Sequence, residues 1–163
     1  MEMLVKAMVF TALLVFLSLC AASAQAVGWF FMVEVKDNDV KYVIPVQQAI
    51  EKGKAEGLLS NDIKFYFSGQ SHSAIETTLT EDFVAHKEIK RGNRDEEKVC
   101  SELVLSALNQ LQERARSEGG NAVINIVSFF KKRSFKSENL YECYIGRVKA
   151  SVTLKGDIVK LKE

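Results

Sequence analysis

The side chains best suited to chemistry in this chain are two cysteines, Cys100 and Cys143, which lie far apart in the sequence. Thiolates that bind zinc usually come in closely spaced pairs such as C-x-x-C, together with nearby histidines. Neither cysteine has such a neighbour. The pattern therefore indicates no metal site, and it leaves two interpretations, a disulfide bridge or two separate buried thiols.

The first 26 residues bear on this choice. Lys6 precedes an apolar run from Met8 to Ala22, and Ala24-Gln25-Ala26 then has the small-x-small pattern of a cleavage site. This order is typical of a secretory signal peptide. We therefore expect residues 1–26 to be removed and the protein to be periplasmic. Disulfides persist in such oxidising compartments, so we predict a bridge between Cys100 and Cys143.

The same segment has two other interpretations. The protein is a lipoprotein if it is anchored through Cys20, but lipid-attachment sites usually have a small residue before the cysteine and here Leu19 stands there. A retained membrane helix needs about 20 apolar residues, and this apolar run is shorter. Cleavage after Ala26 is the interpretation that we adopt.

The other candidate groups are cationic or polar. A dense basic run, Lys131-Lys132-Arg133-Ser134-Phe135-Lys136, has Phe129 and Phe130 directly before it. Its four cations form either a solvated hairpin tip or a patch that contacts anionic lipid or glycan. His72 and His86 lie in a weakly patterned stretch without carboxylates at ligand spacing, so we expect surface or loop histidines. The chain has 22 basic and 21 acidic side chains, a balance that does not indicate nucleic-acid binding.

The periodicity indicates which elements position these groups. Apolar residues recur at helical spacing over 95–118, where Cys100 lies on the apolar face. Asn93 with Glu96 fits a capping box, and Gly119 suits a left-handed stop. A shorter helix is expected over 46–56, and strand patterns occur at 29–33, 40–44, 62–67, 121–133 and 140–155.

These elements predict one α+β domain over residues 27–156. We expect a sheet of about four strands with the long helix packed across it, and a hairpin between strands 121–133 and 140–155. Asn125 is the odd polar residue in a row formed by Ala122, Ile124 and Ile126. The charged stretch 87–94 is expected to be a solvated loop, and residues 157–163 a loose tail.

Several segments together resemble a known family. They are Val43-Ile44-Pro45, Ile63 to Gln70, Asp95 to Cys100, Gly120 to Ser128, and Tyr141-Glu142-Cys143. Over about residues 40–156 the chain resembles small exported proteobacterial proteins often labelled "excinuclease ATPase subunit". That label implies ATP-driven DNA repair, but the sequence has no GxxxxGK[ST] loop to hold phosphates.

A more distant resemblance concerns the fold. The long helix followed by a Gly-Asn-Ala-Val strand is similar to the Rcs stress-sensor lipoprotein and to small proteins described as heavy-metal-binding. This resemblance implies an α+β sheet with a helix packed on it, and it implies no particular function.

No catalytic constellation is visible in the sequence. There is no GxSxG elbow, no cysteine placed with a histidine, and no obvious carboxylate pair. We therefore expect a non-enzymatic binding or sensing domain of the cell envelope, with an envelope partner and no cofactor. Two alternatives stay open: a small enzyme assembled from scattered residues, and a thiol-redox protein that uses Cys100 and Cys143.

Overall fold

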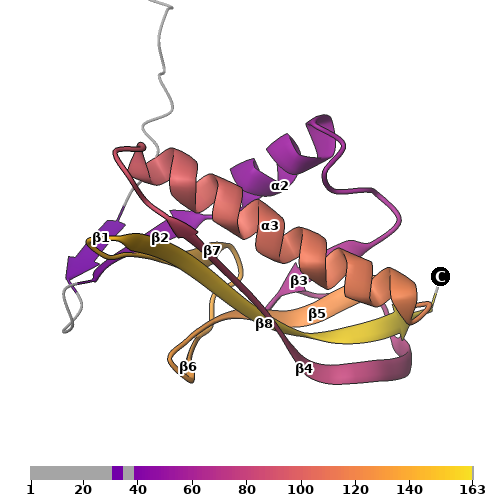
Figure 1. Cartoon of the computed structure of the whole chain (residues 1–163). Helices are drawn as coiled ribbons and strands as arrows, with labels where there is room; N and C mark the ends of the chain where they lie inside the picture. Colours follow the sequence, from indigo (N-terminus) through magenta and orange to yellow (C-terminus); the bar gives the residue numbers. More distant parts are fainter. Residues whose placement is uncertain (1–30, 35–38, 163) are drawn as a thin grey trace, which may run out of the picture.

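The chain folds into a curled sheet with two helices on one face, as seen in a computed structural model that describes residues 31–34 and 39–162 (Figure 1). The expected signal peptide and Cys20 lie outside the described residues. The described elements are β1 (Phe31–Glu34), β2 (Val40–Pro45), α2 (Gln47–Ala55), β3 (Lys64–Phe67), β4 (Ile75–Lys90), α3 (Glu96–Ser117), β5 (Ala122–Phe130), β6 (Arg133–Phe135), β7 (Leu140–Ile145) and β8 (Lys149–Leu161). The α+β class is confirmed, but the estimate of four strands is wrong, because the described part contains eight.

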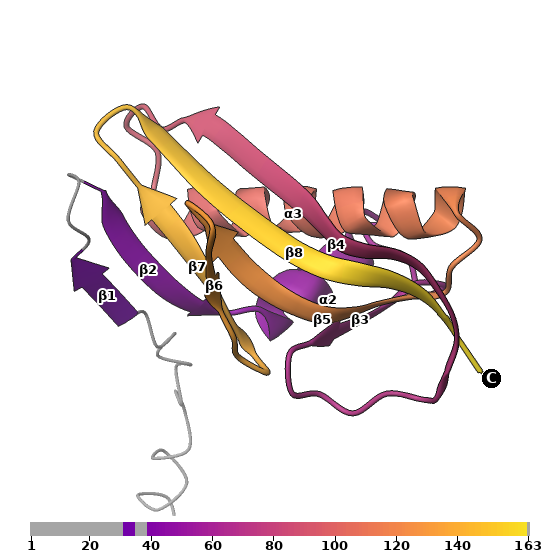
Figure 2. The ribbon, with the colours of Figure 1, turned by 90° about the horizontal axis from the view of Figure 1, so that it is seen from below.

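Strand β8 is the centre of the sheet. It pairs with β4 along one edge, while its other edge pairs first with β7 and then with β5. From β7 the sheet continues through β2 to β1, and from β5 it continues to the parallel strand β3. Figure 2 shows this arrangement from below, with the short strand β6 in front of the sheet and α3 behind it. The two faces of the sheet are therefore covered differently.

The expected hairpin of 121–133 with 140–155 is replaced by a more complex arrangement. A tight turn at residues 146–149, closed by a 2.8 Å hydrogen bond from the Gly146 N–H to the Lys149 carbonyl, divides the second segment into β7 and β8. The first segment also ends earlier, because the chain reverses after Phe130 to form β6. β5 still pairs antiparallel with β8, so both segments belong to one sheet.

The tail predicted for residues 157–163 is also wrong. Strand β8 continues to Leu161, and Ile158 and Val159 are fully buried. The sequence suggested a strand end at Gly156, but this glycine lies inside the strand. A Cβ atom there would lie 2.9 Å from Val123 Cγ1 and 3.1 Å from the Ile124 carbonyl oxygen. Glycine is present because β5 approaches so closely, and it does not end the strand.

Strand β4 was missed because its sequence hides its alternation. Phe83, Ala85 and Ile89 point toward α3, and burial alternates regularly along this part of the strand. However, Lys87 lies on the inner side and Val84, which is 40 % exposed, lies on the outer side. Edge strands commonly carry such charges, which discourage pairing with other chains. The charged stretch expected to be a solvated loop is therefore the end of β4 and the turn that follows it.

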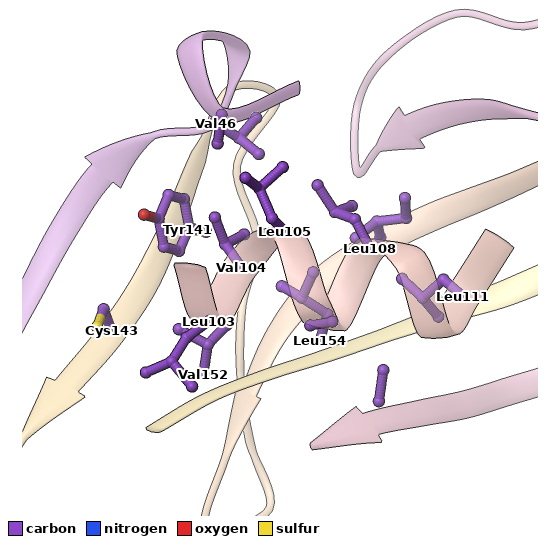
Figure 3. Packing of buried hydrophobic residues seen from close by; sticks show 14 of the residues in the cluster. Val46, Leu103, Val104, Leu105, Leu108, Leu111, Tyr141, Cys143, Val152 and Leu154 are labelled. Atoms are coloured by element: carbon purple, nitrogen blue, oxygen red, sulfur yellow. The ribbon is translucent and has the colours of Figure 1, made fainter. Parts of the chain in front are cut away.

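Helix α3 packs across the sheet as expected, and both of its ends are well defined. The cap is Asp95 rather than Asn93, because its side chain accepts a 2.9 Å hydrogen bond from the Lys98 N–H. At the other end Gly119 has φ +75°, and the Gly120 N–H bonds the Ala115 carbonyl, which is the expected left-handed stop. Figure 3 shows the buried layer, in which Leu103 and Leu108 of the helix pack with β7 and β8.

A bulge in β5 changes which side chains face this layer. Asn125 has φ +53°, and the register of β5 with β8 shifts between Ile124 and Val127. As a result Val123 and Ile126 pack under α3, whereas Ala122 and Ile124 join a second cluster on the other face. The uniform alternation predicted from the sequence is wrong here, because a bulge inserts one residue into the pattern.

No helix in the described part of the chain is both long enough and apolar enough to cross a membrane.

Candidate functional site

The predicted disulfide is confirmed. Cys100, in the first half of α3, is bonded to Cys143 of β7, and their Cα atoms lie 5.8 Å apart. Both residues are fully buried. Exchange requires a thiolate to reach one of the two sulfurs, and here the helix and the sheet cover both. The geometry is that of a structural bridge between α3 and the sheet, and it weighs against the thiol-redox alternative.

The bridge also fixes which side chains of β7 face outward. Because Cys143 points toward α3, its neighbours Glu142 and Tyr144 point to the opposite face, which we call the outer face. The basic run after β5 lies on the same side, since β6 lies in front of the sheet in Figure 2. The outward side chains of β7 and the basic run meet where Phe130, the residue directly before the run, stacks on Tyr144.

The basic run forms a tight two-residue turn. Lys131 and Lys132 connect β5 to β6 with φ values of +47° and +63°, a left-handed conformation that is normally taken by glycine or asparagine. Holding two lysines in this conformation costs about 1–2 kcal/mol per residue. The Lys131 ammonium lies 3.9 Å from the Asp39 carboxylate, whereas Lys132, Arg133 and Lys136 form no ion pair with any described residue.

Beside this turn the outer face contains an open depression of about 430 Å³. Its floor is aromatic, because Phe130 stacks on Tyr144 with ring centroids 3.5 Å apart and ring planes 13° apart. Arg147 and Lys149, from the turn between β7 and β8, line its other side. The two turns therefore place cations on both sides of an aromatic surface.

A buried carboxylate supports this floor. Glu142 is 5 % exposed and lies 3.1 Å from the Lys41 ammonium, and it accepts a 3.1 Å hydrogen bond from the Tyr144 hydroxyl. The Ser128 hydroxyl accepts a hydrogen bond from the backbone N–H of Glu142. Burial, and then the Glu142 charge, raise the pKa of Tyr144, so its hydroxyl keeps its proton and donates. The aromatic floor is thus held in a fixed position.

The histidines and Asn125 lie in different places. His86 lines the depression, and its Nδ1 lies 2.7 Å from the Thr153 hydroxyl. His72 lies apart from it, with Nδ1 2.8 Å from the Ser73 carbonyl and its ring edge against Tyr66. Asn125 bonds Asp157 at the bulge. Among the described residues no group of three or more His, Cys, Asp or Glu side chains is placed to hold a metal ion.

Sequence reasoning found the four cations of the basic run but missed Tyr144, Arg147 and the depression itself. The Gly146-Arg147 pair is a turn signal within the segment predicted as one strand. With the segment divided there, Arg147 falls in a second turn. No local signal could have placed Phe130 on Tyr144, because that contact depends on how two strands are arranged in the sheet.

Comparison with protein-family models, with curated proteins and with solved structures gave no significant match. The family resemblance and the periplasmic location therefore stay predictions.

Proposed function

We propose that this protein is a non-enzymatic binding domain of the cell envelope, and that its outer face contacts an anionic surface of lipid or glycan. The observation that carries the proposal is the arrangement around the depression. Lys131, Arg147 and Lys149 line the depression around its aromatic floor, and the adjoining basic run adds three more cations. Of these side chains, Lys132, Arg133, Lys136 and Arg147 form no ion pair with any described residue.

The strained turn supports the proposal. A turn that served only to reverse the chain would be more stable with asparagine and glycine at its two central positions. Here lysines occupy both positions, at a cost in backbone energy. Strain of this kind is often kept where a side chain is needed for binding, and these two lysines project at the tip of the hairpin.

The chemistry suits an extended anionic partner better than a single small ion. Basic residues near an anionic leaflet contribute about 1 kcal/mol each, and this attraction falls off within a Debye length. The exposed edges of Phe130 and Phe135, both partly buried, add apolar contact area next to the charges. Four to five such cations give a reversible, salt-sensitive attachment.

The test is co-sedimentation with vesicles at low salt. The protein should bind vesicles rich in phosphatidylglycerol and not vesicles of phosphatidylcholine. Changing Lys131, Lys132, Arg133 and Lys136 to serine should weaken binding by at least about tenfold, because about 1 kcal/mol is lost per cation. A soluble sulfated polysaccharide, used as a competitor, distinguishes glycan from lipid as the preferred surface.

The matched control removes the same charge from elsewhere. Lys54, Lys64, Lys160 and Lys162 are exposed and lie outside the depression, so changing them to serine should leave most of the binding. Equal loss in both variants would show that net charge alone attracts the protein. No loss in the first variant would rule out the proposed surface.

A further inference from the structure

A second candidate site lies on the helix side of the sheet, away from the outer face. A cleft of about 360 Å³ separates α2 from the first turns of α3. Pro45 and Ala49 form its apolar part, and Tyr141 of β7 closes it from the direction of the sheet. Clefts of this volume are in the range that small ligands occupy.

Tyr141 is the observation that points to a ligand. The residue is 1 % exposed, yet its hydroxyl has no hydrogen-bond partner among the described residues. The hydroxyl is not sealed off, since Tyr141 lines the cleft and Arg91 Nε is the only fully buried side-chain polar atom without a partner among the described residues. A molecule that enters the cleft can therefore supply the hydrogen-bond partner that such groups normally have. Figure 3 shows the ring beside Val104 of α3, with the hydroxyl pointing away from that helix contact. Burial, and then the charge of Glu97, raise the pKa of Tyr141, which keeps the hydroxyl protonated.

The rim of the cleft carries charges of both signs. Glu97 and Lys98, from the first turn of α3, form no ion pair with any described residue. Lys52 of α2 faces them across the cleft, and its only ion pair among the described residues is a 4.0 Å contact with Glu56. Asp95, whose side chain caps α3, also lines the cleft, so a molecule seated here can meet two carboxylates, two ammonium groups and the Tyr141 hydroxyl around an apolar wall.

We propose that this cleft binds a small zwitterion with an apolar side chain, of the free amino-acid class. Its ammonium group pairs with Glu97, and its carboxylate lies between Lys98 and Lys52. The Tyr141 hydroxyl donates to that carboxylate, and the side chain packs on Pro45 and Ala49. This set of partners favours a compact apolar molecule that carries one positive and one negative charge, since a ligand with a single charge leaves a charged group on the rim unpaired.

The test uses chemical-shift titration of the ¹⁵N-labelled protein with L-leucine. Titration to ten times a Kd of about 1 mM should give saturable shifts at amides of α2 and the start of α3. L-leucinamide lacks the carboxylate and N-acetyl-L-leucine lacks the ammonium, so both should bind clearly more weakly. Tyr141→Phe removes only the hydroxyl and should weaken leucine binding about fivefold.

The controls separate recognition from folding. Tyr66→Phe removes a hydroxyl outside the cleft and should bind leucine as the unchanged protein does. Glu97→Gln should abolish the preference for L-leucine over N-acetyl-L-leucine while the fold is retained. Absence of saturable shifts, or equal binding of all three probes, would overturn the proposal. Neither result bears on vesicle binding, because the cleft and the outer face are on opposite sides of the sheet.

Discussion

The side-chain amide of Asn125 donates a 2.8 Å hydrogen bond to one carboxylate oxygen of Asp157, across the pair β5 and β8. The other oxygen of Asp157 accepts a 2.9 Å hydrogen bond from the backbone N–H of Asp82 in β4. Asn125 and Asp82 both have left-handed backbone, with φ of +53° and +54°, at register shifts. One carboxylate therefore joins bulges on both sides of the central strand. Bulges bend strands and increase their twist, which accounts for the curl of the sheet where these two bulges flank β8.

Two substitutions at Asn125 separate the hydrogen bond from the backbone conformation. Asn125→Gly loses the bond but accepts a positive φ, so we expect a loss of about 1 kcal/mol in the free energy of unfolding. Asn125→Ala loses the bond and also strains the backbone, which adds about another 1–2 kcal/mol. Urea unfolding measures both. Asn93→Ala, at an exposed position, should change stability by less than about 0.5 kcal/mol. Equal losses for alanine and glycine would contradict the left-handed conformation.

Much of the helix layer could be predicted from the sequence, because its signals are local. The apolar face of α3 repeats at helical spacing, and Gly119 comes soon after its last turn. The disulfide was predictable for a related reason: the helix face containing Cys100 had to pack on the sheet that contains Cys143. In each case one periodic pattern determined which side of an element is buried.

The outer face could not be predicted in the same way, because bulges and turns reset the pattern there. Asn125 shifts β5 by one residue, so the inward rows after it are exchanged. Gly156 suggested a strand end, although it is the residue that lets β5 and β8 approach at the bulge. The contact between Tyr144 and Phe130 can be predicted only when these register shifts are known. The candidate site was therefore visible in sequence only as its basic turn.

Raising the pH above 10 should destabilise the protein through its buried tyrosines. Burial, followed by the hydrogen bond to Glu96, raises the pKa of Tyr42 to about 12. The folded state thus holds this proton more tightly than the unfolded chain, so the stabilisation is complete below pH 10 and is lost as pH rises toward 12. Unfolding midpoints measured between pH 8 and pH 11 should fall, and they should fall less steeply in Tyr42→Phe. Parallel curves for both proteins would contradict this account.

At low pH the ion pair between Asp62 and Arg116 should weaken. The hydrogen bonds from Arg116, at 3.0 Å, hold the pKa of the Asp62 carboxyl below its usual range. A carboxyl whose pKa is lower in the folded state stabilises the fold at pH values above its unfolded-state pKa. This stabilisation is lost as the pH falls through the folded-state pKa. Asp62 is mostly exposed, so the effect is small and is screened by salt. The difference in unfolding free energy between the protein and Asp62→Asn should be positive at pH 7 and vanish near pH 2. A difference unchanged across this range would show that the pair contributes nothing through charge.

Removing the disulfide should lower stability by a large amount and in a non-additive way. The bridge joins positions 43 residues apart. In the chain-entropy model, a bridge that closes a loop of this length lowers the conformational entropy of the unfolded chain and so stabilises the fold by about 4 kcal/mol. The total free energy of unfolding of a domain is roughly 5–15 kcal/mol. Cys100→Ala and Cys143→Ala each break the same bond, so each single variant should lose nearly as much as the double variant. Because both sulfurs are fully buried, the folded protein should also resist reduction and alkylation until it is unfolded in urea. Two single losses that add up to the loss of the double variant, or rapid reduction of the folded protein, would show that the bridge does not have this structural role.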